Sequence, residues 1–237
     1  GNVQQAVNHD FTSQDGVTRG GFVCYPELGV VPYGQVWTYN AIGAAPDLRD
    51  VAYGSNLFVA VGSSAVIYSS PDAITWTLRT SPITPSYSDI SYANGRFVAV
   101  GGATGAAPSP VVYSDDGINW FAPTTPFSGS HRGIAYGNGV WIAVGTGVIS
   151  ISSDNAVTWA TTSFPSLGIS TGVTFANGLF CIVGSSGNIV TTVNGSSLSF
   201  VSVPASGVLV DIAFGNQTFV ALDANGQVFT STDTLTW

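Results

Sequence analysis

The sequence contains no lysine and no methionine, and Glu27 is its only glutamate. The five basic residues are all arginines, and charged residues make up 8% of the chain, against about 25% in ordinary soluble proteins. The formal net charge is −8. Because binding to a phosphate backbone requires clustered cations, this composition argues against a nucleic-acid partner.

Long apolar runs and a cysteine framework are also missing. No stretch approaches the roughly 18 consecutive apolar residues of a membrane span, so we do not expect membrane insertion. The N-terminal residues also show no signal-peptide pattern. The absence of Met at position 1 indicates a processed, tagged or truncated chain. Two cysteines, Cys24 and Cys181, do not make a disulfide framework, and whether they pair stays open.

Glycine and apolar residues, by contrast, are abundant and arranged in a repeat. Hydrophobic residues make up 45% of the chain, which is enough to form a sizeable core. Five segments align without gaps. They are DVAYGSNLFVAVG (50–62), DISYANGRFVAVG (89–101), GIAYGNGVWIAVG (133–145), GVTFANGLFCIVG (172–184) and DIAFGNQTFVALD (211–223). Cys181 stands where the other copies have Val or Ile, which favours a buried apolar role for this thiol.

The repeat keeps its phase from Trp37 to Trp237. The aromatic residue at its fourth position falls at Tyr53, Tyr92, Tyr136, Phe175 and Phe214, in equal steps except for a longer one between Tyr92 and Tyr136. A second marker precedes each of these aromatics at a constant spacing, at Trp37, Trp76, Trp120, Trp159 and Leu198, and Trp237 continues the series. The one longer step is explained by an insertion at 102–110, which is expected in a surface loop.

Each repeat predicts four short antiparallel strands. In the second copy, the run 90–92 precedes an Asn-Gly hairpin turn, 96–100 is an apolar strand, 111–113 is a third strand, and Trp120 begins a fourth. Four strands at a spacing of about 40 residues are the signature of a β-propeller blade. We therefore predict an all-β propeller, and the count favours five blades; a truncated ring of six or seven blades is the alternative.

The predicted domain organisation is an N-terminal arm or linker over 1–36, out of phase with the repeat, followed by a propeller over 37–237. The repeats run over about 37–75, 76–119, 120–158, 159–197 and 198–236. Residues 37–41 are in a position to form the outer strand of the last blade and so to latch the ring, in which case Trp37 and Trp237 compete for one position.

The segments between the third and fourth predicted strands resemble a known motif. SPDAITW (70–76), SDDGINW (114–120) and SSDNAVTW (152–159) are similar to Asp-box (BNR, sialidase-like) repeats, in which the box is a turn between these strands. Only the third copy has the family's Asp-to-Trp spacing, and it carries Ala156 where glycine is usual. The resemblance covers 37–237, implies the propeller fold, and extends to repeats of bacteriophage virion and bacterial surface proteins.

No catalytic, cofactor or metal set is predicted. The sialidase-like family uses an arginine cluster, a tyrosine–glutamate pair and an acid aspartate, but Glu27 lies outside the repeats. Asp50, Asp89 and Asp211 begin equivalent strands and are candidates for the central channel, where paired carboxylates serve glycoside hydrolysis. Strand-entry capping is the simpler interpretation.

Other polar residues also have simple structural interpretations. We interpret Asp72, Asp116, Asp154 and Asp233 as turn-stabilising residues and not as metal ligands. His131 is expected to be a solvated loop residue.

The loops that join successive blades vary most in length and composition, and recognition on rigid scaffolds usually resides in such loops. Candidate ligand contacts there are Tyr87, Phe127, His131, Arg132 and Phe164.

Together these features favour a non-enzymatic binding or structural module of a virion (phage tail, fibre or capsid decoration) or an extracellular cell surface. Its expected partner is a glycan or protein on a host surface or within a virion, and a homo-oligomer is possible. Two alternatives stay open: a divergent secreted glycosidase, and a structural spacer alone.

Overall fold

The computed structural model describes residues 7–12, 18–24, 47–84, 86–102, 111–124, 129–185, 187–203 and 207–237. Their regular secondary structure is almost entirely β-strand, and they include no helix of the length and apolarity that a membrane span requires. The chain divides into two units, Gly1–Ala41 and Ile42–Trp237. In the first unit, β1 (Val7–Thr12) and β2 (Thr18–Cys24) form an antiparallel hairpin.

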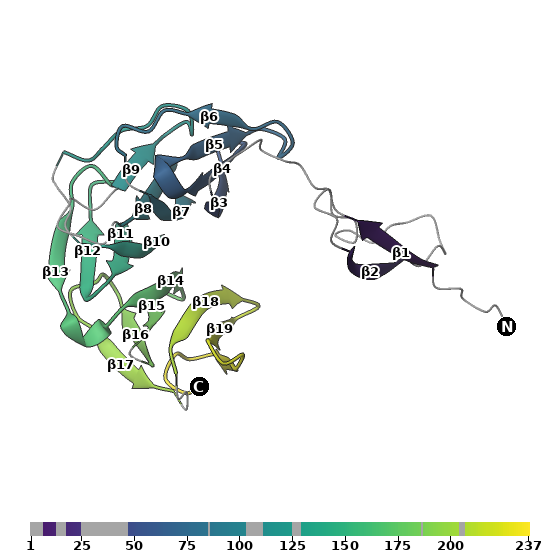
Figure 1. Ribbon diagram of the computed structural model, residues 1–237. Helices are drawn as coiled ribbons and strands as arrows, with labels where there is room; N and C mark the ends of the chain where they lie inside the picture. Colours follow the sequence, from purple (N-terminus) through teal and green to yellow (C-terminus); the bar gives the residue numbers. More distant parts are fainter. Residues whose placement is uncertain are drawn as a thin grey trace. The chain divides into compact units, whose positions relative to one another are not determined.

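The second unit contains five antiparallel sheets, blades 1 to 5, which follow one another around an arc (Figure 1). Blade 1 comprises β3 (Leu48–Gly54), β4 (Leu57–Gly62), β5 (Ile67–Ser70) and β6 (Thr77–Arg79). Blade 2 comprises β7 (Tyr87–Ala93), β8 (Arg96–Gly101) and β9 (Val111–Ser114). Blade 3 comprises β10 (His131–Gly137), β11 (Val140–Gly145), β12 (Val148–Ser152) and β13 (Ala160–Ser163). Blade 4 comprises β14 (Ser170–Ala176), β15 (Leu179–Gly184), β16 (Asn188–Thr192) and β17 (Ser199–Ser202). Blade 5 comprises β18 (Leu209–Gly215), β19 (Thr218–Asp223) and β20 (Val228–Ser231).

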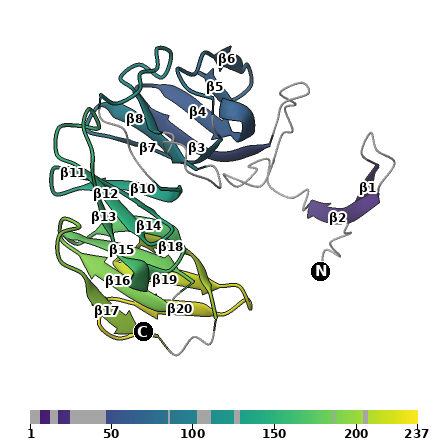
Figure 2. The ribbon, with the colours of Figure 1, turned by 60° about the vertical axis from the view of Figure 1, so that its left-hand side comes forward.

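Within each blade, neighbouring strands in the chain are neighbours in the sheet. The first strands, β3, β7, β10, β14 and β18, lie along the inside of the arc, and the last strands lie outside (Figures 1 and 2). In blade 2 a bridge between Tyr113 and Phe121 stands in place of a fourth strand. The predicted all-β propeller is confirmed, with five blades among the described residues. The predicted latch at 37–41 lies outside those residues.

The hairpin between the first two strands follows from the Asn-Gly sequence. Asn94 and Gly95 have φ values of 50° and 74°, which is the left-handed backbone that a two-residue turn between twisted strands requires. The turns of the other blades also have positive φ, at Asn138 and Asn177 among others. The short turn fixes the register, so that Tyr92 lies opposite Phe97 and their rings are 4.5 Å apart.

A glycine ends the second strand of blades 1 to 4, and it is required for a different reason from the glycine of the hairpin turn. A Cβ added at Gly145 would lie 1.8 Å from the carbonyl oxygen of Ser130, and at Gly101 it would lie 2.1 Å from that of Ser86. The chain entering the blade therefore passes too close for any side chain. This contact explains why the repeat ends in Val-Gly.

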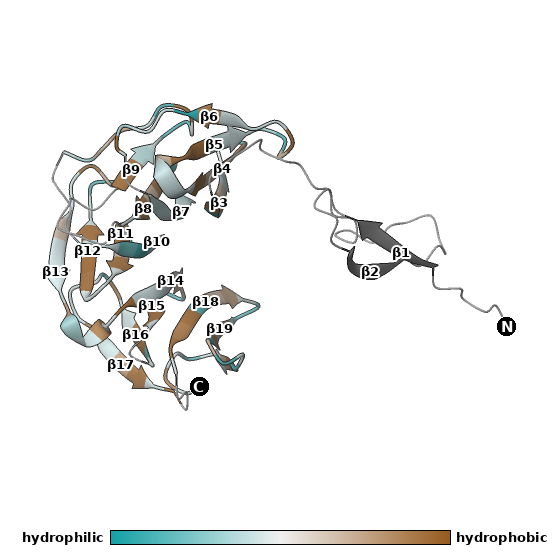
Figure 3. Ribbon diagram, viewed as in Figure 1, coloured by the Kyte–Doolittle hydropathy of each residue, from teal (hydrophilic) through white to brown (hydrophobic). Residues whose placement is uncertain are grey.

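In the described part of the chain the core consists of four apolar clusters, one between each pair of successive blades. Val59 and Val61 of blade 1, for example, pack with Ile90 and Phe97 of blade 2. Because both faces of an internal blade are covered, β11 and β15 are apolar along their whole length (Figure 3). Burial on both faces explains how a chain with so little charge has so many hydrophobic residues.

The Ser–Asp segments form tight turns after the third strands. Asp72 Oδ1 accepts hydrogen bonds from the backbone N–H groups of Ile74 and Thr75 at 2.8 and 2.7 Å. Asp233 accepts two equivalent bonds, and these amides lower its pKa to about 2. The predicted turn-stabilising role of these aspartates agrees with this geometry.

Candidate functional site

The five innermost strands surround a cavity of about 400 Å³. Its lining residues come from the first half of each strand, so the cavity occupies the central channel at the end where the chain enters every blade. A second cavity of about 500 Å³ is lined by Arg49, Ser88, Arg132 and Thr171. These four residues line both cavities, and we call them the channel mouth.

The channel mouth combines two guanidinium groups with two hydroxyl groups. Each of its residues immediately precedes the first position of a repeat, so four successive blades contribute one side chain each. Arg49 and Arg132 are exposed, and neither forms an ion pair with any residue in the described part of the chain. Unpaired guanidinium groups beside hydroxyl donors can bind a carboxylate, sulfate or phosphate group.

The predicted channel aspartates lie at the wall of this cavity, where they connect successive blades. Asp50 accepts a hydrogen bond from the backbone N–H of Ile90, one blade further on, at 2.8 Å. Asp89 repeats the arrangement with Ile134 at 2.7 Å and also accepts from Ile90 at 2.8 Å. Both carboxylates therefore hold the inner strands of neighbouring blades together.

The same repeat position is Asp211 in blade 5 and glycine in blades 3 and 4, and none of these residues links two blades as Asp50 and Asp89 do. Among the described residues, Asp211 accepts only from the N–H of its neighbour Ile212, at 2.8 Å. At Gly172 an added Cβ would lie 3.0 Å from Asp211 Oδ1, and at Gly133 it would lie 3.1 Å from Val173 Cγ1. A side chain at this position in blades 3 and 4 would therefore crowd the next blade.

Burial raises the pKa of Asp89 well above its ordinary value, and the hydrogen bond and charge of the adjacent Asp50 raise it further. A carboxyl group whose pKa is raised by folding favours the folded state most when it is protonated. Its contribution is therefore complete below pH 3.8, the ordinary value, and is lost as the pH rises through the raised value.

We expect the Asp89→Asn variant to lose this part of the pH dependence. The free energy of unfolding of the parent protein should fall more steeply from pH 4 towards neutral pH than that of the variant. The measurement is urea unfolding at several pH values, with Asp211→Asn as the control that keeps the parent slope. Equal slopes for the parent and Asp89→Asn would contradict the assignment.

Two of the predicted ligand contacts are wrong because their side chains are buried. Tyr87 is fully buried, its hydroxyl bonds to Ser81 at 2.6 Å, and burial raises its pKa to about 12. His131 is not a solvated loop residue: it lies in β10, fully buried, with Nε2 2.9 Å from Ser150 Oγ. Burial lowers the pKa of His131 to about 4, so the ring is neutral at physiological pH. Their position beside variable loops misled the prediction, since both side chains point into the blade.

The other three candidates separate in the structure. Arg132 lies at the channel mouth. Phe164 is half-buried and packs against the core between blades 3 and 4, and Phe127 lies outside the described residues. The sequence interpretation missed Arg49, Ser88 and Thr171. Their shared place before the first repeat position was the signal that would have found them.

Cys181 is a buried thiol without a disulfide partner among the residues whose side chains the structure describes. Burial raises its pKa to about 12, as expected for an apolar substitute in β15.

Comparison with known proteins supports the fold. No protein-family model and no curated protein matches the chain. Solved structures do: YCF48 bound to D1 peptide has a TM-score of 0.63 at 18% identity, over 92% of this chain and 71% of that chain. A computationally designed protein, Ika8, has a TM-score of 0.63 at 14% sequence identity. The match covers 80% of this chain and 59% of the length of Ika8. A chain of the nidogen–laminin complex has a TM-score of 0.55 at 12% sequence identity, over 79% of this chain and 81% of that chain. At these identities the likeness shows the β-propeller fold alone.

Proposed function

We propose that this chain is a non-enzymatic binding module of a virion or cell surface, and that its channel mouth holds an acidic group of a glycan or protein partner. The observation that carries the proposal is the cavity of about 500 Å³ lined by Arg49, Ser88, Arg132 and Thr171. Two of the five basic residues of a chain with net charge −8 line this one cavity. A local positive site on an acidic surface selects a small anionic group over an extended polyanion.

The hydroxyl groups and the aspartates refine the expected ligand. Ser88 and Thr171 add donors between and beside the guanidinium groups, which suits the planar oxygens of a carboxylate or sulfate. Asp89 stays protonated to higher pH than an ordinary aspartate, so it contributes less repulsion to an anion in the channel. The virion or surface location rests on the resemblance of the Ser–Asp repeats.

We expect anions to bind at the channel mouth and Arg132→Gln to weaken that binding. The measurement is a titration with sodium sulfate and with sodium acetate, followed by backbone amide chemical shifts. Ser88, Arg132 and Thr171 should shift together, and Arg132→Gln should raise the apparent Kd at least about tenfold, the loss of one charge-assisted contact.

Arg79→Gln is the matched control for this titration. It removes one positive charge from β6, where the Arg79 side chain bonds to Ser69 at 2.7 Å, away from the channel mouth. It should leave the apparent Kd unchanged. Shifts scattered over the surface, or equal weakening by both variants, would refute the site.

A glycosidase is the second candidate, because Asp50 and Asp89 come together at the channel wall. The raised pKa of Asp89 suits a general acid. Against it, both oxygens of Asp89 already accept backbone hydrogen bonds. Turnover of a chromogenic glycoside panel that is lost in Asp50→Asn or Asp89→Asn would establish this function in place of the first, and inactivity across the panel would retire it.

A further inference from the structure

The carboxyl groups of Asp50 and Asp89 converge on one backbone hydrogen at the channel wall. The N–H of Ile90 donates both to Asp50 Oδ2 and to Asp89 Oδ1, in each case at 2.8 Å. Two carboxylate oxygens that share one amide hydrogen lie side by side, and their like charges repel each other. A single proton held between the two groups removes this repulsion, because a protonated carboxyl donates a hydrogen bond to its neighbour. We call Asp50 and Asp89 the carboxyl pair.

The carboxyl pair and the channel mouth face the same space. Asp50 and Asp89 line the channel cavity of about 400 Å³ together with the four residues of the mouth. They follow Arg49 and Ser88 directly in the chain, so blades 1 and 2 each carry a carboxyl group beside a mouth residue. An anion at the mouth is therefore repelled by the pair, and the repulsion is weaker when the pair holds a proton.

The other charged and titratable groups on the strands around the pair have different surroundings. Asp211 lines the same cavity from β18, and among the described residues it accepts only the N–H of Ile212. Arg96 lies at the hairpin end of β8, where it pairs with Asp115 at 2.6 Å. His131 is buried in blade 3, and burial lowers its pKa to about 4, so the ring is neutral above pH 5. The tyrosines of these strands are Tyr87, whose pKa burial raises to about 12, and, at the opposite strand ends, Tyr53, Tyr92 and Tyr136.

The raised pKa of Asp89 agrees with this geometry, since burial and the adjacent Asp50 both favour its protonated form. An anion at the channel mouth adds negative charge to the same cavity and raises this pKa again. The coupling between two bound groups is reciprocal. Protonation of the carboxyl pair must therefore tighten anion binding by the factor by which the anion tightens the proton.

We propose that the channel mouth binds its anion together with one proton on the carboxyl pair, and that it releases the anion when this proton leaves. The inference rests on the proposed function, because it concerns the same anion site. Arg49 and Arg132 keep their charge at all the pH values concerned, so pH acts on the cavity through its carboxyl groups. The acidic group of the partner is thus held at acidic pH and released as the pH rises.

The test is calorimetric titration of the full chain with sodium sulfate at pH 5 and pH 8, at constant ionic strength. Sulfate keeps the same charge over this range, so any change in affinity belongs to the protein. The parent should bind about tenfold more weakly at pH 8, the factor that corresponds to one pKa unit of coupling. Asp89→Asn and Asp50→Asn each leave one carboxyl of the pair, so each should bind at pH 8 about as tightly as the parent does at pH 5. Tighter binding cannot result from a variant that fails to fold.

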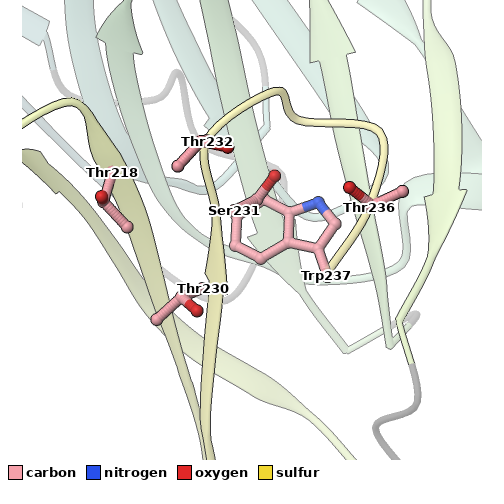
Figure 4. Close-up of a pocket in the computed structure, with 6 residues that line it drawn as sticks. All are labelled: Thr218, Thr230, Ser231, Thr232, Thr236 and Trp237. Carbon is pink, nitrogen blue, oxygen red and sulfur yellow. The ribbon is translucent and has the colours of Figure 1, made fainter.

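Two variants control for other charges and other cavities. Asp211→Asn removes a carboxyl group from the same cavity but not from the pair, so the ratio of the Kd values at the two pH values should match that of the parent. A cavity of about 340 Å³ beside Trp237 has hydroxyl groups and an indole, but no charge, among its described lining residues (Figure 4). Thr230→Val in that cavity should leave sulfate binding unchanged at both pH values.

The outcomes separate this inference from the proposed function. Absence of sulfate binding at both pH values would remove the anion site and, with it, the inference. Binding with equal Kd at pH 5 and pH 8 would leave the anion site in place and overturn its coupling to a proton. A pH dependence that Asp89→Asn and Asp50→Asn both retain would assign the titrating group to another part of the chain and overturn the role of the carboxyl pair.

Discussion

Replacing Trp141 with alanine should lower the free energy of unfolding by about 3–5 kcal/mol. Trp141 is fully buried in the cluster between blades 2 and 3, its ring lies 5.0 Å from that of Tyr136, and its Nε1–H donates to Asn155 Oδ1 at 3.0 Å. The substitution leaves a cavity between two blades and also frees the Asn155 carbonyl from its donor.

The measurement for this variant is the midpoint and slope of urea unfolding, followed by circular dichroism. Leu78→Ala is the control, because Leu78 in β6 is 60% exposed and its loss should change the free energy of unfolding by no more than about 0.5 kcal/mol. A cost below about 1 kcal/mol for Trp141→Ala would mean that the interface between blades 2 and 3 is not packed as described.

The substitution Gly145→Ala adds a single methyl group and should lower the free energy of unfolding by about 3 kcal/mol. The new Cβ would lie 1.8 Å from the Ser130 carbonyl oxygen, and that oxygen also accepts the N–H of Thr146 at 3.0 Å. Relief requires the entering chain and β11 to separate, which breaks this hydrogen bond and loosens the inner end of blade 3.

Thr146→Ala is the neighbouring control. Thr146 is exposed, and its backbone hydrogen bond survives the change, so its thermal midpoint should match that of the parent. A Gly145→Ala protein that melts with the parent would show that the close backbone approach is relaxed in solution.

The blades were predictable because several signals at one spacing agree. The Asn-Gly turn fixes the register of the first hairpin, the Val-Gly ending marks a close backbone approach, and the Ser–Asp turn leads into the fourth strand. The structure adds the cause of each, which the sequence does not contain: the Ser130 carbonyl at Gly145, for instance, belongs to the segment that enters the blade before β10. Pairwise contacts of this kind depend on tertiary packing and not on local pattern.

The site was less predictable, because exposure depends on the side to which a strand residue points. Tyr87 and Arg132 both lie close to the blade-joining loops, yet Tyr87 is buried and Arg132 lines the channel mouth. In β10 the ladder shifts register between His131 and Gly133, so Arg132 is the extra residue of a β-bulge and is exposed, whereas the neighbouring His131 is buried. Repeat-aligned columns would have separated these residues, whereas loop membership did not.

Anion binding at the channel mouth can be tested on one array that carries carboxylated, sulfated and neutral glycans together with acidic peptides. The array is probed in parallel with the parent chain and with the double variant Arg49→Gln, Arg132→Gln. We expect the parent to bind the acidic members and the double variant to lose them, and neither protein to bind the neutral glycans. Binding of neutral glycans alone, binding that the double variant retains, or no binding by the parent would contradict an anion-binding channel mouth.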